Sequence, residues 1–208
     1  MTPPAGTRPA LRPTRTLPDG YRPAGSIDLS KNAPAQLGLS LAGVALFFLF
    51  GAGFAWAIGR LRQDIDGISW SFGAGGLLLG ALALVATTAA VVVLHEAAHG
   101  LCFWLLTGER PRYGFKGAYA YAAAPDWHFP RGAYAVAGAA PLVLLSLGGL
   151  LLALVAPPGA LPLLLYALTM NAAGAIGDIL VLGWVAASPR GALFRDRGDA
   201  VERFVPGD

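Results

Sequence analysis

Residues 77–107 read LLLGALALVATTAAVVVLHEAAHGLCFWLLT, and this stretch determines what kind of protein the chain can form. It contains one formally charged residue, Glu96, in a length well above the roughly 20 apolar residues that a membrane-spanning helix needs. A helix of this length measures about 46 Å at about 1.5 Å per residue, so it must tilt, protrude or break near its glycines. The stretch predicts a lipid-surrounded helix with an ionisable motif inside it.

The composition of the whole chain agrees with a membrane protein. Of 208 residues, 55% are hydrophobic and 13% are charged, whereas a soluble domain has about 25% charged residues. Further apolar stretches occupy residues 37–59, 132–156 and 161–187. We therefore predict an all-α membrane protein with four transmembrane helices, forming one domain over residues 37–187.

Polar segments flank this domain. Residues 1–36 are rich in proline and arginine, which predicts a flexible basic tail. Large apolar residues alternate around a Lys-Gly turn in residues 113–121, and residues 193–205 surround the turn 196–199. Both patterns are typical of small β-hairpins, the second within a C-terminal hairpin tail over residues 188–208. Amphipathic cover at the membrane interface is the alternative for each.

The distribution of basic residues predicts the orientation in the membrane. Of fifteen Lys and Arg, only Arg60 and Arg62 lie outside residues 1–36, 108–131 and 188–208. The positive-inside rule then places both termini, and the loop between the second and third helices, in the cytoplasm. Because the basic residues form no dense patch, we expect a lipid bilayer and no nucleic acid as partner. The excess of Arg over Lys, with abundant Ala and Gly, favours a bacterial source and hence the inner membrane.

The motif inside the second stretch is His95-Glu-Ala-Ala-His99, which has the pattern HExxH. Its spacing puts both imidazoles on one helical face, one turn apart, where they can share a zinc ion at about 2.0 to 2.1 Å. Glu96 would then flank the metal and can take a proton from water held there. We predict zinc as cofactor and Glu96 as the catalytic residue; two helix-packing histidines are the alternative.

A catalytic zinc site needs a third protein ligand and an open position. Asp178 is the one charged residue between positions 132 and 189, and charges at membrane depth mark function by default. Counted from the predicted cytoplasmic helix ends, His95, His99 and Asp178 all lie about 12 to 18 Å deep at about 1.5 Å per residue. Asp178 is therefore the predicted third ligand; a buried carboxylate bonded to nearby freed backbone is the alternative.

Three further residues are weaker candidates. Asn171 precedes Asp178 by seven residues on the same helical face, so it can bind a substrate backbone or a ligand carboxylate, or simply pack between helices. His128 lies in the cytoplasmic loop and can hold substrate or form polar surface. Cys102 is not expected to bind zinc, because a fourth protein ligand would close the site.

Three motifs together resemble a known family. They are His95-Glu-Ala-Ala-His-Gly100 on one membrane helix, Ala137-Gly-Ala-Ala-Pro141 at the start of the next, and the segment from Asn171 to Asp178 on the last. They look like the three-helix core of site-2-type intramembrane metalloproteases, and the chain is more closely similar to the small four-helix zincin peptidase family DUF3267. In that family, as here, a Pro-Arg segment and an Asp-containing hairpin, which holds Asp196, follow the last helix.

The resemblance covers about residues 37–205 and implies ligand roles for His95, His99 and Asp178, with the catalytic role for Glu96. The expected function is a membrane-embedded zinc metalloprotease that cleaves a membrane-associated protein or peptide near the cytoplasmic face. The metal, with Asn171, would stabilise the oxyanion. The alternative is a non-proteolytic membrane adaptor, metal-binding regulator or transporter that retains the same site.

Overall fold

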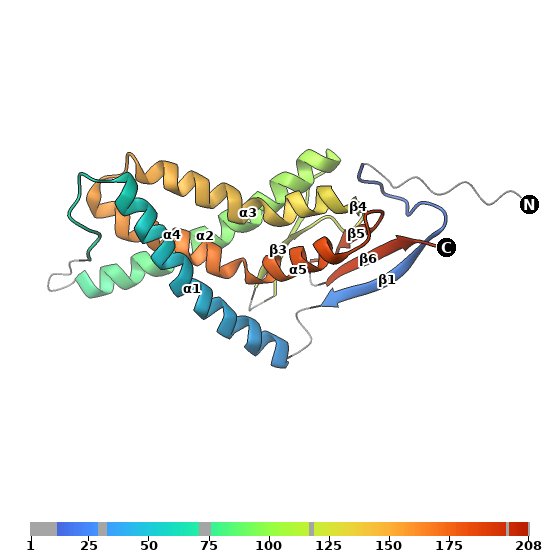
Figure 1. The fold of residues 1–208 in the computed structure, drawn as a ribbon, viewed down its shortest axis with the longest axis horizontal. Coiled ribbons are helices and arrows are strands. Elements are labelled where there is room, and N and C mark those ends of the chain that lie inside the picture. Colours follow the sequence, from blue (N-terminus) through green and yellow to red (C-terminus); the bar gives the residue numbers. More distant parts are fainter. Residues whose placement is uncertain (1–11, 29–32, 71–75, 117–118, 199, 208) are drawn as a thin grey trace, which may run out of the picture. The chain divides into compact units, whose positions relative to one another are not determined.

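The computed structural model describes residues 12–28, 33–70, 76–116, 119–198 and 200–207 (Figure 1). The chain forms two compact units. The first contains residues up to 36, 96–140 and from 177 onward; the second contains residues 37–95 and 141–176. Several long helices run through both units, so the boundary between them cuts continuous helices.

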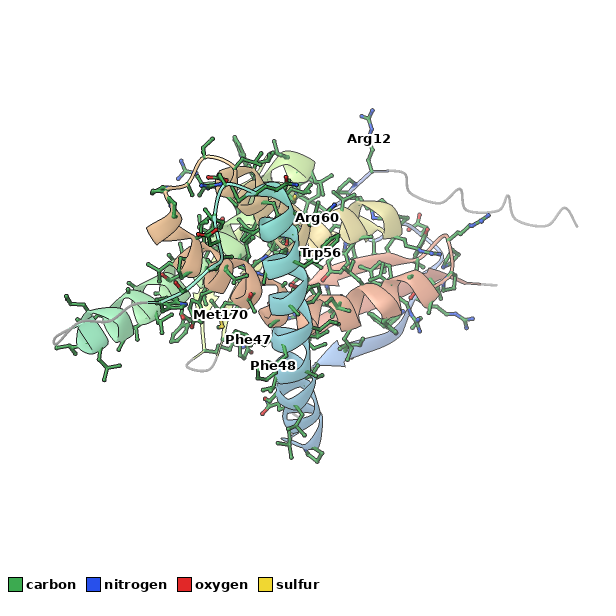
Figure 2. The ribbon with its side chains drawn as sticks, turned by 60° about the vertical axis from the view of Figure 1, so that its left-hand side comes forward. Arg12, Phe47, Phe48, Trp56, Arg60 and Met170 are labelled. Carbon is green, nitrogen blue, oxygen red and sulfur yellow. The ribbon has the colours of Figure 1, made fainter. Side chains whose placement is uncertain are left out.

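Three unbroken helices match three of the predicted apolar stretches. They are α1 (Ala33–Leu61), α2 (Gly76–Thr107) and α3 (Arg131–Ala153), and each is long and apolar enough to cross a membrane. The long helix α2 has no break near its glycines. Its length must therefore be accommodated by tilting or by protruding from the membrane. Large aromatic side chains such as Phe48 and Trp56 are each 71% exposed along α1 (Figure 2), as expected for a surface that lipid covers.

The fourth apolar stretch is not the single helix that we predicted. After the short 3-10 helix η1 (Pro158–Ala160), it forms α4 (Leu161–Gly174) and α5 (Ile176–Ala187), bent by 42°. The backbone N–H of Ala175 closes α4 by donating to the carbonyl of Asn171 at 3.1 Å. Glycine is a poor helix former, which explains why the helix breaks beside Gly174. The described residues thus contain three candidate spans, or four if the bent pair counts as one.

The first unit contains a four-stranded antiparallel sheet in the order β1-β6-β5-β4. Its strands are β1 (Tyr21–Asp28), β4 (Phe129–Pro130), β5 (Leu193–Asp196) and β6 (Ala200–Pro206). The pairing of β5 with β6 confirms the predicted C-terminal hairpin, although residue 199 in its turn lies outside the described residues.

The prediction of a flexible tail over residues 1–36 is wrong for β1, which pairs with β6 from Tyr21 to Asp28 (Figure 1). Pro23 made this segment resemble a loop, but β1 is an edge strand whose register shifts between Pro23 and Ser26. Edge strands and bulges are the two places where a sheet accepts proline. The sequence of this strand has no clear alternation of apolar residues, so its pairing depends on the partner strand.

The hairpin predicted over residues 113–121 is confirmed as β2 (Arg112–Phe115) and β3 (Ala120–Ala123), with residues 117–118 outside the described chain. The hydroxyl of Tyr113 lies so close to Gly100 of α2 that a Cβ there would overlap it. Glycine at position 100 leaves room for this approach. Tyr113 of the hairpin thus contacts α2 directly after the HExxH motif.

An aromatic core joins the sheet to the helices of the first unit. Phe129, Tyr134 and Phe194 are each at most 4% exposed, and the rings of Tyr134 and Phe194 stack with centroids 5.5 Å apart. Phe103 near the end of α2 packs on Phe129 at 5.2 Å. Buried aromatic pairs of this kind contribute about 0.5 to 1.5 kcal/mol beyond their area. The core therefore fixes the first turn of α3 against the sheet.

A buried arginine organises the second unit. Arg62, 8% exposed, donates to the carbonyl of Ala153, the last residue of α3, at 2.9 Å and to that of Ala156 at 2.6 Å. Its Nε atom also pairs with Asp64 at 2.8 Å. Carbonyls at a helix C-terminus have no intrahelical donor, and a guanidinium supplies several. Arg62 thus caps α3 while its charge is balanced.

We expect Arg62→Ala to lower the midpoint of thermal unfolding in detergent, because it leaves the carbonyls of Ala153 and Ala156 without their donors. Arg60→Ala is the matched control, since Arg60 is exposed two residues earlier. Equal midpoints for the two variants would show that the cap contributes nothing to stability.

Candidate metal centre

Helix α2 presents the two histidines of the HExxH motif from a single uninterrupted segment. His95 and His99 lie one turn apart on this helix, so their relative position depends only on helix geometry. Both are half-buried, and so is Glu96, which follows His95 directly. An ordinary helix therefore delivers two imidazoles to one face.

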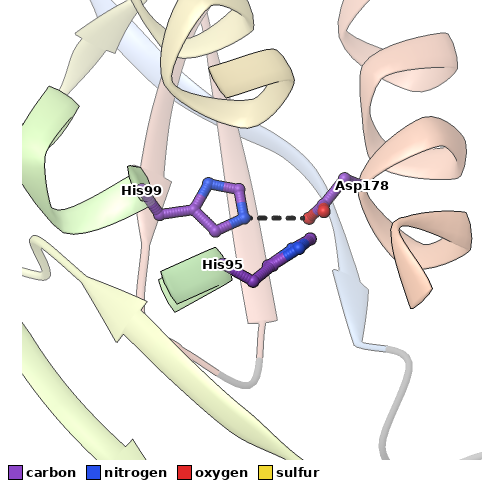
Figure 3. A group of neighbouring side chains, drawn as sticks. All are labelled: His95, His99 and Asp178. Carbon is purple, nitrogen blue, oxygen red and sulfur yellow. Dashed lines mark ion pairs between the residues drawn. The ribbon is translucent and has the colours of Figure 1, made fainter. Parts of the chain in front are cut away.

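Asp178 joins these histidines from helix α5. Its Oδ1 atom lies 3.4 Å from Nε2 of His99, and one ligand atom from each of His95, His99 and Asp178 falls within 4.8 Å of the others (Figure 3). Two ligands held about 2.0 to 2.1 Å from one tetrahedral zinc ion stand roughly 3.4 Å apart. The distance and the donor set, two imidazoles and one carboxylate, both fit a catalytic zinc site with an open position.

A backbone carbonyl determines which nitrogen of His99 faces the site. Nδ1 of His99 lies 2.9 Å from the carbonyl oxygen of Ala137 on α3. That carbonyl lacks its usual helical donor, because the residue four positions later, Pro141, has no N–H. A carbonyl only accepts, so Nδ1 carries the proton and Nε2 keeps the lone pair that binds a metal. Pro141 thus leaves an acceptor free in the place where His99 needs one.

His95 is oriented in the same way by a side chain. Its Nδ1 lies 3.0 Å from Oδ1 of Asn171, whose Nδ2 donates to the carbonyl of Pro141 at 3.2 Å. The second contact fixes the amide with its oxygen toward His95, so Nδ1 of His95 donates and Nε2 is again left for the metal. Asn171 is 2% exposed and both ends of its amide are bonded. Asn171 is thus placed to orient His95, and its binding of substrate or the oxyanion stays a prediction.

The bend after α4 explains how an aspartate is accommodated here. Asp178 lies in the first turn of α5, a helix end that would not exist if the stretch were continuous. The first N–H groups of a helix lack intrahelical acceptors, and a negative side chain near them is stabilised. The break at Ala175 therefore provides a favourable place for the carboxylate.

A second carboxyl group, that of Asp196, interacts electrostatically with residues of this site. Asp196 at the end of β5 accepts hydrogen bonds from the hydroxyl of Tyr134 at 2.6 Å and from the N–H of Gly198 at 2.8 Å. Burial raises the pKa of Asp196 above its ordinary range, and these two donors oppose the rise. The charges of His99 and Asp178 also act on this carboxyl. Asp196 thus links the sheet electrostatically to the metal centre.

The structure places the remaining candidates elsewhere. His128 is 5% exposed, packs edge-on against Phe204 at 5.1 Å and exchanges backbone hydrogen bonds with Thr14. His128 is thus a buried residue of the first unit, and its binding of substrate stays a prediction. Cys102 is a free, half-exposed thiol beside the aromatic core and is not part of the metal-binding group.

Sequence reasoning missed the carbonyl of Ala137, because backbone atoms are not visible in a list of residue types. A signal was nevertheless present. A proline inside a helix leaves the carbonyl four residues before it without its usual donor. For Pro141, that carbonyl belongs to Ala137. Tyr134, which holds Asp196, was also missed.

One known family matches the part of the chain that contains these residues. The family DUF3267, described as Putative zincin peptidase, matches residues 88–193, just over half of the 208-residue chain. The matched segment contains the HExxH motif, Pro141, Asn171 and Asp178. Searches of curated proteins and of solved structures give no match.

This family description supports a metallopeptidase, and the group of His95, His99 and Asp178 can hold a metal ion. The chain belongs to the DUF3267 family.

We expect Pro141→Ala to weaken zinc binding about 10- to 100-fold, the usual cost of disturbing a group that orients a metal ligand. The new N–H at position 141 would compete with His99 for the carbonyl of Ala137. Pro162→Ala is the matched control, because Pro162 lies in the first turn of α4, where an N–H has no helical acceptor. Competition with a chromophoric zinc chelator gives the affinities, and equal values for both variants would contradict this role of Pro141.

Proposed function

We propose that this protein is a membrane-embedded zinc metalloprotease that hydrolyses a peptide bond of a membrane-associated protein near the cytoplasmic face. One observation carries the proposal. Nε2 of His99 and Oδ1 of Asp178 lie 3.4 Å apart, and Nδ1 of each histidine is bonded to an acceptor. A merely structural pair of histidines would not need a carboxylate oxygen within 4.8 Å of a ligand nitrogen of each.

Residues of the chain divide the chemistry among them. When bound, zinc supplies a Lewis acid that polarises the scissile carbonyl and lowers the pKa of a water molecule. Glu96 accepts a proton from the attacking water and later returns it to the leaving amine. Ala137 and Asn171 hold the two imidazoles in their metal-binding tautomer.

The β2-β3 hairpin is the proposed holder of the substrate. In the part of the chain that the structure describes, β2 pairs only with β3, so its other edge can accept a further strand. Tyr113 on β2 contacts Gly100, one residue after His99. A peptide added to β2 would be extended, as hydrolysis requires, because a helical segment shields its amide bonds.

The membrane placement rests on the apolar helices α1, α2 and α3 and on the bent pair α4 and α5. Counting that pair as one span gives four, with both termini and the β2-β3 hairpin on the side rich in Arg and Lys. We propose that this side is the cytoplasm and that the membrane is the inner membrane of a bacterium.

We expect Glu96→Gln to keep one zinc ion per chain and to lower the rate of substrate cleavage by about 10²- to 10⁴-fold. The amide has nearly the size of the carboxylate but cannot take the proton. Single-turnover cleavage of a membrane substrate by the zinc-loaded protein in detergent measures the rate. Glu109→Gln, the same change outside the metal-binding group, is the control and should cleave normally.

Wild-type cleavage by Glu96→Gln would contradict the proposed mechanism. If a zinc-loaded but inactive Glu96→Gln protein kept full cellular function, that result would favour the alternative to a protease, a metal-binding regulator without turnover. The His99→Ala variant separates the loss of the metal from the loss of the general base. This variant should no longer bind stoichiometric zinc, although Glu96 is still present.

The orientation is tested with single cysteines in a Cys102→Ala background. A membrane-impermeant maleimide applied to intact cells should label Asp66→Cys, which follows α1, and should spare Arg197→Cys, which follows β5. Arg197→Cys should become reactive after lysis. Labelling of both positions from outside would rule out the proposed topology.

A further inference from the structure

A cleft lies between the start of α3 and the end of α5, both within the first unit. Its volume is about 290 Å³, and it is lined by Arg131, Gly132 and Ala135 on α3 and by Leu182, Val185 and Arg190 on or after α5. The two helices approach closely beside it, since a Cβ on Gly138 would lie 3.2 Å from Leu182. The cleft thus combines two guanidinium groups with an apolar wall.

Within the described residues, these two arginines lack the acidic partners that three other arginines of this unit have. Arg112 pairs with Asp126, and Arg195 and Arg197 both pair with Glu202. Within the described residues, Arg131 donates only to the backbone carbonyl of Ser188, at 2.9 Å, and Arg190 is exposed without an ion pair. The cleft therefore carries two positive charges that no carboxylate of the described chain neutralises.

The cleft also lies where an apolar segment gives way to polar chain. Helix α3 begins at Arg131, and α5 ends at Ala187, three residues before Arg190. In the orientation proposed above, both ends are at the level of the cytoplasmic lipid headgroups. Guanidinium groups bind phosphate through several directed hydrogen bonds, and basic pockets between membrane helices on this side bind anionic headgroups.

We propose that this cleft binds one anionic phospholipid, with its phosphate between Arg131 and Arg190 and an acyl chain along Leu182 and Val185. The apolar wall distinguishes a lipid from free phosphate, because inorganic phosphate has nothing to place there. The assignment rests on the membrane placement proposed above but not on proteolysis. A lipid bridging α3 and α5 would also join the helices that carry Ala137 and Asp178.

Native mass spectrometry of the zinc-loaded full chain, released from detergent with phosphatidylglycerol or phosphatidylcholine, tests the site. Each arginine near an anionic lipid contributes about 1 kcal/mol, so Arg190→Gln should weaken phosphatidylglycerol binding about fivefold. Adding Arg131→Gln should weaken it further, and Arg190→Lys should restore most of the affinity by keeping the charge. Binding of phosphatidylcholine should be weaker and equal in all variants.

Arg110→Gln is the matched control: Arg110 is exposed on the same predicted side and lies outside the cleft, so its loss should leave the affinity unchanged. Zinc content confirms that each variant is folded, and if the double variant fails to fold, Arg190→Gln alone decides.

Wild-type affinity of Arg190→Gln for phosphatidylglycerol would overturn the proposal. So would an equal, Arg190-dependent thermal stabilisation by inorganic phosphate, which would indicate a simple anion site. A protein that binds the lipid but cleaves nothing would refute proteolysis and leave the cleft assignment standing.

Discussion

The hydrogen bond from Nδ1 of His99 to the carbonyl of Ala137 connects the candidate metal centre to the backbone of α3. It exists because Pro141 removes the N–H that would otherwise occupy that carbonyl. One covalent feature of α3 therefore determines the tautomer of a ligand on α2. Pro141 acts twice, since its own carbonyl accepts from Asn171 and so fixes the amide that orients His95.

The break between α4 and α5 lowers the free-energy cost of placing the carboxylate of Asp178 in an apolar environment. An aspartate in the middle of a continuous membrane helix finds no free backbone donors, whereas Asp178 lies in the first turn of α5. The same interruption leaves Asn171 at the end of α4, four residues before the residue that closes it. Asn171 and Asp178 therefore both lie near helix ends.

The sheet of the first unit contacts the first turn of α3, the helix whose Ala137 carbonyl bonds His99. Tyr134 stacks on Phe194 and donates to Asp196, which anchors the first turn of α3 three residues before Ala137. Strand β1 adds the N-terminal segment to the same sheet, and Arg203 on β6 secures it through two hydrogen bonds to the carbonyl of Ala24. Residues distant in sequence thereby hold one end of the helix that orients His99.

The sequence by itself determined the features that depend on local geometry. His95 and His99 share a face because any helix brings positions four apart together. Asp178 stood out because a charge is rare in an apolar stretch. The tertiary structure decided the rest. The pairing of β1 with β6 and the position of Asn171 beside His95 each depend on a partner far away in the chain. Periodicity and composition describe only neighbours, so they cannot identify the acceptor of a hydrogen bond or the strand beside an edge.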